Sequence, residues 1–231
     1  NAMVTAGDDV SLEVKTIPSG IWVLDNALKG GWRRGSLNEI CGLFSTGKTW
    51  LLYNTIKQAQ DLGLICALID SEGRYDPVWA RDKIGIDVSK LIYVRNPRTL
   101  EDAFSLVYQW VKEEVDLIGI DSLASLLPRQ FAEQKDFSST IGVKARVMSE
   151  GLEKLISVNK NAVILAVNQL RVDIGSRFNR GILSKMPGGS RQYYDAASII
   201  EVRKKGWIRE AGDLAGEEDD NKQAKKIGYT M

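Results

Sequence analysis

Residues 42–49 carry two glycines, a lysine and a threonine at the spacing of a phosphate-binding loop. They match the pattern G-x-x-x-x-G-K-[ST] in full. The glycines let the backbone turn tightly, so that its N–H groups face phosphate oxygens. Lys48 can reach the β- and γ-phosphates, and the Thr49 hydroxyl can ligate Mg²⁺. The sequence therefore predicts a site for ATP with Mg²⁺, formed by Gly42, Phe44, Ser45, Thr46, Gly47, Lys48, Thr49 and Trp50.

Two carboxylates that follow apolar runs complement this loop. The run 117–120 ends in Asp121, which would place a carboxylate beside the Thr49 magnesium as in a Walker B arrangement. Thr49 and Asp121 are thus the candidate metal ligands. Hydrolysis also needs a group that orients or deprotonates the attacking water. Glu72, just past the apolar run 64–69, is a candidate, although a solvated loop carboxylate is an equally good interpretation of the residues alone.

The elements that must position these groups are short apolar runs alternating with longer helical stretches. The expected strands are Leu37–Cys41, Leu64–Asp70, Leu91–Val94, Leu117–Asp121, Ala162–Asn168 and Ile199–Arg203. The expected helices are Lys48 to about Leu62, Pro77 to about Ile84, Thr99 to about Val115 and Gly142 to about Asn159. Strands separated by helices of this length imply right-handed crossovers, and hence an α/β fold with a mostly parallel sheet.

Two long segments, about 130–141 and about 171–194, do not fit this alternation. Loops of such length are uncommon in a compact domain unless they are functional. Both follow strands that end in polar residues, and ligands of open α/β sheets bind at that carboxyl edge. Simple insertions remain an equal alternative.

Composition limits the remaining classes. The chain has 231 residues, which suits one α/β domain, and its net charge of +1 requires any nucleic-acid surface to be a local patch. With no histidine and only Cys41 and Cys66, a zinc site is not expected. Both cysteines lie in apolar runs, which predicts buried thiols in a reducing, cytoplasmic compartment. No apolar run is long enough to span a membrane.

From about Thr16 to Arg203 the chain resembles the bacterial RecA recombinase family, with phage and archaeal RadA-type relatives more distant. The resemblance rests on the phosphate loop and on stretches that lie before and after it: 16–20, 24–28, 70–72, 76–81, 120–126 and 166–171. It implies a RecA-type P-loop core, a C-terminal β-hairpin region, and an ATPase that binds DNA. The expected layout is a cloning remnant at residues 1–2, a short lead-in at 3–35, and the ATPase core at 36–231.

The resemblance also implies individual roles at the nucleotide. Glu72 takes the place of the family's catalytic, water-activating glutamate, and Gln169 that of the glutamine that senses the γ-phosphate; with Lys48 they form the expected catalytic set. Asp76 would lie near the adenine amino group. Trp79 would stack on adenine, where the family usually has tyrosine.

For DNA, the resemblance makes the segments about 130–141 and 171–194 the two DNA loops. The expected contacts to single-stranded DNA are Arg146, Ser149, Arg171, Arg177, Arg180, Gly188, Gly189 and Ser190. Glu153 departs from the family, which has an arginine facing DNA there, and a carboxylate would repel phosphate. Tyr194 matches an interface aromatic and Lys226 a lysine reaching the neighbour's ATP, although a core aromatic and a solvated lysine are equal alternatives.

These features predict a DNA-dependent ATPase that self-associates on single-stranded DNA as a head-to-tail filament or ring and promotes strand pairing in recombination and repair. The alternative is a regulatory or accessory RecA-core paralogue that binds ATP and DNA without strand exchange. A small-molecule phosphotransferase is a third possibility, but it would need an acceptor pocket and a lid.

Overall fold

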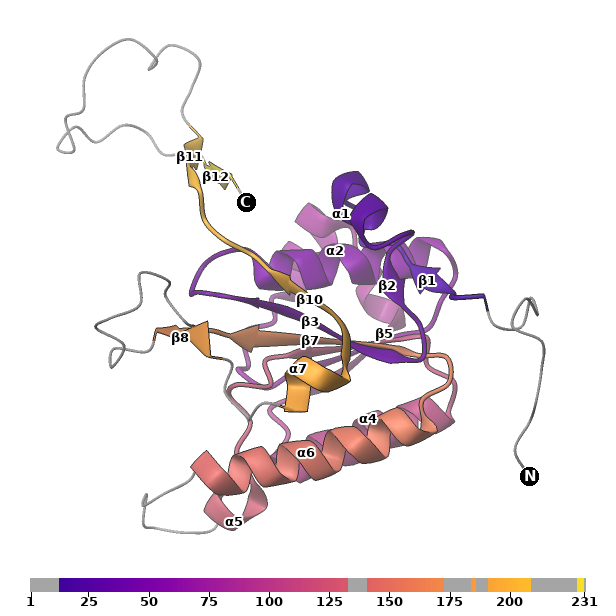
Figure 1. Cartoon of the computed structure of the whole chain (residues 1–231). Helices are drawn as coiled ribbons and strands as arrows, with labels where there is room; N and C mark the ends of the chain where they lie inside the picture. Colours follow the sequence, from indigo (N-terminus) through magenta and orange to yellow (C-terminus); the bar gives the residue numbers. More distant parts are fainter. Residues whose placement is uncertain (1–12, 133–140, 173–183, 186–190, 209–227, 231) are drawn as a thin grey trace, which may run out of the picture.

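The computed structural model describes residues 13–132, 141–172, 184–185, 191–208 and 228–230. Its centre is a six-stranded sheet of order β10-β3-β7-β6-β4-β5 in which every neighbouring pair is parallel (Figure 1). The strands are β3 (Ser36–Gly42), β4 (Cys66–Asp70), β5 (Leu91–Arg95), β6 (Leu117–Asp121), β7 (Val163–Gln169) and β10 (Ala196–Glu201). The expected α/β class with a parallel sheet is confirmed.

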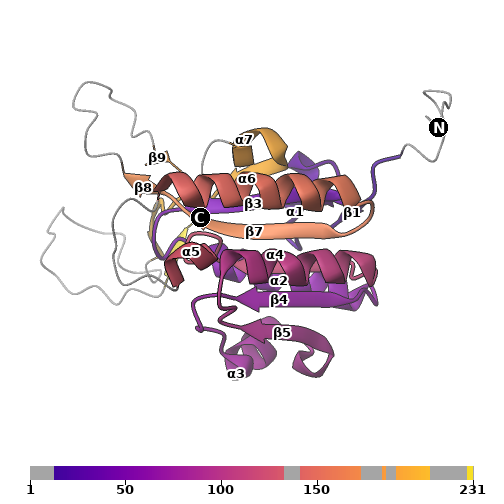
Figure 2. The same ribbon diagram turned by 90° about the horizontal axis from the view of Figure 1, so that it is seen from below.

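Helices cover both faces of this sheet because the central strands are apolar on both sides. Helix α2 (Lys48–Asp61) packs on one face, where Ile40, Leu52 and Val167 belong to one buried cluster. Helices α4 (Leu100–Lys112) and α6 (Ile141–Val158) lie together on the other face, as Figures 1 and 2 show. Gly151 allows this close approach, because an added Cβ there would lie 2.2 Å from the Phe104 ring.

Two helix starts follow local chemistry in the sequence. Thr99 is the N-cap of α4, and its hydroxyl accepts a hydrogen bond from the Asp102 N–H at 3.1 Å. Asp76 caps α3 (Pro77–Trp79), which has proline at its first position and continues as a π-helix over Ala80–Ile84.

Several elements differ from the expectation. A two-stranded sheet of β1 (Thr16–Ile17) and β2 (Trp32–Arg33), with α1 (Trp22–Ala27) between them, was not predicted, and Ile17 and Trp32 are fully buried. The segments expected to be loops contain short elements at their ends, because a few residues there pack on or pair with their neighbours. These are α5 (Arg129–Ala132), the antiparallel pair β8 (Arg171–Val172) and β9 (Ser184–Lys185), and α7 (Arg191–Asp195).

Other expectations hold. β11 (Gly206–Ile208) pairs antiparallel with β12 (Gly228–Thr230), which confirms a C-terminal hairpin region. Cys41 and Cys66 are buried, free thiols. Among the described residues, no helix is long and apolar enough to cross a membrane.

Glu39 is a buried carboxyl in the middle of β3. Its side chain is fully buried, and neither carboxylate oxygen has a hydrogen-bond partner among the described residues. Burial raises the pKa of Glu39 from 4.5 to about 7, and the nearby Asn168 amide offsets only part of this rise. A carboxyl with a higher pKa in the folded chain binds its proton more tightly there, so the free energy of unfolding should fall as pH rises from 4.5 to 7.

Glu39→Gln should remove this pH dependence. Relative to wild type, the variant's free energy of unfolding should rise between pH 4.5 and 7 by up to about 3 kcal/mol, and level off above that range. Urea unfolding of both proteins at several pH values measures these free energies. Parallel curves for the two proteins would show that Glu39 does not titrate in this window.

Candidate nucleotide site

The phosphate loop joins the end of β3 to the start of α2, as the motif requires. Gly42 ends the strand with φ +157°, and an added Cβ would lie 2.4 Å from the Val202 carbonyl oxygen, so only glycine fits. Gly47 precedes α2 with φ +97°, a left-handed conformation that glycine adopts without strain. The positive end of α2 thus begins at Lys48, directly behind the loop.

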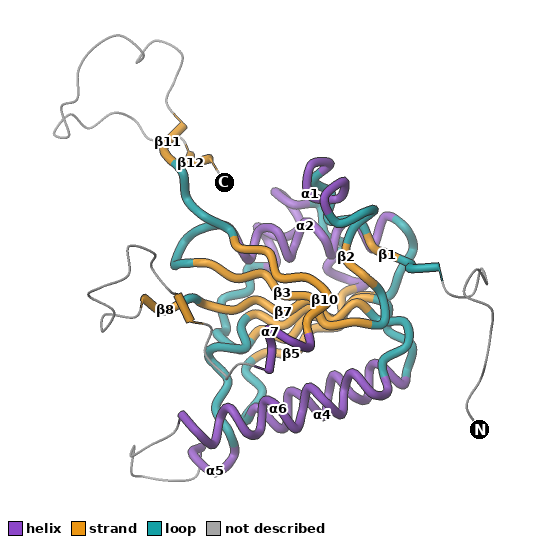
Figure 3. The backbone as a smooth tube through the Cα atoms, in the orientation of Figure 1, coloured by secondary structure: helices purple, strands orange, loops and turns teal. Residues whose placement is uncertain are grey.

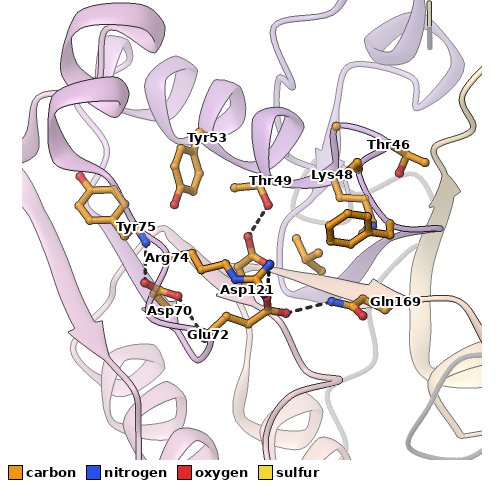
Figure 4. Close-up of a pocket in the computed structure, with 14 residues that line it drawn as sticks. Thr46, Lys48, Thr49, Tyr53, Asp70, Glu72, Arg74, Tyr75, Asp121 and Gln169 are labelled. Atoms are coloured by element: carbon orange, nitrogen blue, oxygen red, sulfur yellow. Dashed lines mark hydrogen bonds and ion pairs between the residues drawn. The ribbon is translucent and has the colours of Figure 1, made fainter. Parts of the chain in front are cut away.

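A pocket opens in front of this loop (Figure 4). Its lining includes residues at the carboxyl ends of the parallel strands, which Figure 3 traces in orange. The strand register explains why distant side chains meet there: Asp70 pairs with Asp121, Asp121 with Val167, and Gly42 with Gln169. The lining residues are Phe44, Ser45, Thr46, Gly47, Lys48, Thr49, Tyr53, Asp70, Glu72, Arg74, Tyr75, Asp121, Val167 and Gln169. Of the expected ATP-loop residues, Gly42 and Trp50 are not among them; Trp50 packs against the core cluster beneath α2.

Lys48 is held close to the loop. Its Nζ donates to the Leu43 carbonyl oxygen at 2.6 Å, and its side chain is buried. Burial lowers the pKa of Lys48, and the Asp121 carboxylate opposes that change. A desolvated ammonium facing the pocket attracts phosphate oxygens more strongly than an exposed one does, because the local dielectric is low.

Thr49 and Asp121 form the candidate magnesium site. The Thr49 hydroxyl donates to Asp121 Oδ2 at 2.7 Å (Figure 4). Burial raises the pKa of Asp121 to about 6, with further contributions from Glu72 and Asp70. No group of three or more His, Cys, Asp or Glu side chains among the described residues could hold a metal. A hydroxyl beside one carboxylate fits Mg²⁺, which usually binds one or two protein carboxylates together with substrate phosphates and water.

Glu72 lies beside this pair and has three partners. Its Oε1 accepts from the Ser122 hydroxyl at 2.9 Å and from Gln169 Nε2 at 3.0 Å. Its Oε2 forms an ion pair with Arg74 at 3.2 Å. The structure therefore brings the expected catalytic set of Lys48, Glu72 and Gln169 to one pocket (Figure 4).

Comparison with known proteins agrees with this arrangement. Residues 1–227 match the family model of the RecA N-terminal domain. The chain belongs to the RecA family. It is 36% identical to Protein RecA of Brucella anthropi over 218 residues and 37% identical to Protein RecA of Chlorobaculum tepidum over 220 residues. Each match covers 93% of this chain, which spans 59% and 62% of those two RecA proteins respectively.

The RecA resemblance predicted adenine contacts from Asp76 and Trp79, and neither lines the pocket. The Asp76 carboxylate accepts from the Val78 and Trp79 N–H groups as the cap of α3. Trp79 is 36% exposed and packs against Tyr53, with ring centroids 5.7 Å apart. Tyr53 does line the pocket, so Trp79 adjoins it through that ring, and both adenine contacts stay predictions.

Asp70 is a site residue that the sequence did not indicate. Its carboxylate accepts from the N–H groups of Glu72, Gly73 and Tyr75 at 3.2, 2.8 and 2.8 Å, and from the Tyr93 hydroxyl at 3.0 Å. These bonds fix the loop that carries Glu72. Sequence analysis also did not identify Tyr53, Arg74 and Tyr75 as pocket residues. For Arg74, a signal was its position two residues after the candidate base Glu72 and directly after Gly73; for the two tyrosines the sequence offered none.

The structure describes only some of the DNA contacts that the resemblance to the RecA family implied. Arg146 is exposed on α6 and pairs with Glu150 at 2.9 Å, while the Ser149 hydroxyl donates to the Ala145 carbonyl oxygen. For Arg171 the structure describes only the backbone, in β8. Outside the described residues lie Arg177, Arg180, Gly188, Gly189, Ser190 and Lys226.

Glu153 and Tyr194 are the two remaining family-based positions. Glu153 Oε2 pairs with Arg191 Nη1 at 3.0 Å, and Arg191 Nε also bonds Asp195 at 2.8 Å. A cation on α7 therefore neutralises the carboxylate that departs from the RecA pattern. Tyr194 is 84% exposed, so the alternative of a core aromatic is wrong within this chain.

Proposed function

We propose that this chain is an ATP-dependent, single-stranded-DNA-binding recombinase whose DNA-stimulated ATP hydrolysis accompanies head-to-tail self-association and strand pairing. The observation that carries this is the convergence of Lys48, Thr49, Asp121, Glu72 and Gln169 on one pocket at the carboxyl edge of the sheet. The RecA proteins that it resembles support the assignment. The two free thiols suit a reducing compartment, and we propose a cytoplasmic location.

Glu72 is the proposed general base. Water attacks the γ-phosphorus, the bond between that phosphorus and the β–γ bridging oxygen breaks, and ADP leaves with that oxygen. The Glu72 carboxylate accepts the proton lost by the water. Lys48 would bind the β- and γ-phosphates. Thr49 and Asp121 would hold Mg²⁺, which would supply positive charge to the phosphate oxygens.

Gln169 is the proposed link to DNA. Its amide nitrogen bonds Glu72 in this structure, and β8, at the start of the second expected DNA segment, begins two residues later. A γ-phosphate beside Glu72 would compete for the same amide N–H. We propose that this exchange transmits the presence of ATP to the segment after residue 171.

The accessory paralogue remains a second candidate because of the charges on α6. Arg146 is paired with Glu150, and Arg191 with Glu153, so neither arginine offers an unpaired cation to DNA in this structure. A surface neutralised in this way would bind DNA weakly and would not support filament growth.

Binding of a fluorescent single strand tests the proposal. With a non-hydrolysable ATP analogue, affinity should exceed that seen with ADP, and log K should fall with log salt by roughly 0.7 for each phosphate contacted. Sedimentation of the same mixtures separates a filament from an accessory binder. If the single strand showed no salt-sensitive binding with any nucleotide, both the recombinase and the accessory-protein proposals would be contradicted. A phosphotransferase would then be favoured.

A further inference from the structure

Arg74 is a second cation in the nucleotide pocket. Of the described residues that line the pocket, Lys48 and Arg74 are the cationic ones, facing the carboxylates of Asp70, Glu72 and Asp121. Figure 4 shows the Arg74 side chain reaching toward Asp121 and Glu72, across the pocket from Lys48. A polyphosphate that enters such an acidic pocket gains from each cation within reach, because its own charge is strongly negative.

The backbone around Arg74 is fixed. The Asp70 carboxylate accepts from the N–H groups of Gly73 and Tyr75, the residues on either side of Arg74. Arg95 Nη2 also donates to the Gly73 carbonyl oxygen at 3.2 Å. A functional group is positioned accurately when its supporting loop is held by such secondary contacts. Asp70 and Arg95 therefore direct Arg74 at the pocket.

The guanidinium itself is only loosely held. Its ion pair with Glu72 Oε2 spans 3.2 Å, and 72% of the Arg74 side chain is exposed. Exposed ion pairs of this kind contribute little stability. Phosphate oxygens match the planar guanidinium fork and bind it in a bidentate manner. A phosphate group beside Glu72 would therefore displace Glu72 as the partner of Arg74.

We propose that Arg74 binds the γ-phosphate of the bound nucleoside triphosphate and stabilises the charge of the transition state from within the same subunit. The inference rests on the proposed ATP site and adds a residue to it. The γ end is favoured because Arg74 pairs with Glu72, the proposed base, and because Gln169 and the proposed magnesium ligands Thr49 and Asp121 line the same pocket. The exchange also frees Glu72 Oε2 to face the attacking water.

The test compares Arg74→Ala and Arg74→Lys with Arg81→Ala in ATP hydrolysis. Arg81 is a matched control, since its side chain is 57% exposed, pairs with Asp82 and lies outside the pocket lining. Arg74→Ala should lower kcat by about 100-fold or more and leave ADP affinity within about twofold, because ADP lacks the γ-phosphate. Lysine should restore only part of the rate, because it cannot bind in a bidentate manner.

Added guanidinium ion provides a readout that a merely structural role would not move. It should partly restore hydrolysis by Arg74→Ala and leave wild type and Arg81→Ala unchanged. An unchanged or increased kcat in Arg74→Ala overturns the inference, and so does an equal loss of affinity for ATP and ADP. Lack of hydrolysis by wild type itself would overturn the proposed function instead, which separates the two failures.

Discussion

Lys48→Ala is expected to lose ATP binding by about 100-fold or more, because it removes the buried ammonium that faces the phosphates. The chain should still fold. Burial lowers the pKa of Lys48, which means that the folded protein holds this charge at a cost. Within the described part of the chain, the Lys48 ammonium donates one hydrogen bond, to the Leu43 carbonyl oxygen. Titration with a fluorescent ATP analogue measures the loss, and thermal unfolding checks the fold.

Lys57→Ala is the matched control for this variant. Lys57 lies on the same helix, but its partner is the exposed Asp61, and it does not line the pocket. Its loss should leave ATP affinity unchanged. Normal affinity and hydrolysis in Lys48→Ala would show that ATP does not bind at residues 42–49.

Glu72→Gln is expected to keep ATP bound and to slow hydrolysis by about 10²–10⁴-fold. Glutamine preserves the side-chain shape, and its Oε1 can still accept from Ser122 and Gln169 as Glu72 does. The amide cannot take a proton from water at neutral pH, so binding and chemistry separate in this variant. Single-turnover hydrolysis together with ATP-analogue affinity measures both quantities.

Glu113→Gln makes the same chemical change at an exposed position on the C-terminal end of α4, away from the pocket. It should behave as wild type does. If Glu72→Gln turned over ATP as fast as this control, Glu72 would not be the base. The nearby acids Asp70 and Asp121 would then be the next candidates, although their carboxylates are occupied by loop N–H groups and by Thr49.

Local sequence patterns were enough to predict one half of the nucleotide site. The phosphate loop and Asp121 could be predicted because each lies directly at the end of an apolar strand, and the parallel register then brings their ends together. Glu72 and Gln169 were only weakly indicated by the residues alone, and their roles came from the resemblance. The contact between them spans 97 residues, which no local pattern encodes.

The other half of the site could not be predicted, because the turn after β4 decides where its side chains lie. Asp70 lies at a strand end, as a catalytic acid would, yet its carboxylate binds three N–H groups of the following loop. That turn is what aims Arg74 into the pocket. Asp76 likewise caps α3, a local role that its place in the family motif did not reveal.

Glu153 shows that the sequence likewise does not reveal long-range partners on the expected DNA-binding surface. Its charge predicted repulsion of phosphate, but the residue that neutralises it, Arg191, lies 38 positions away on α7. Helix α7 itself falls in a segment expected to be a loop. Its short length and the preceding glycines gave no helical periodicity from which to predict it.

The most direct test of the central claim is the rate of ATP hydrolysis with and without single-stranded DNA, measured across protein concentration. A DNA-binding ATPase that works by self-association should be strongly stimulated by DNA, and its rate should rise cooperatively with protein concentration. A flat rate that does not respond to DNA would contradict the recombinase account and favour an accessory protein that retains the RecA fold for nucleotide binding.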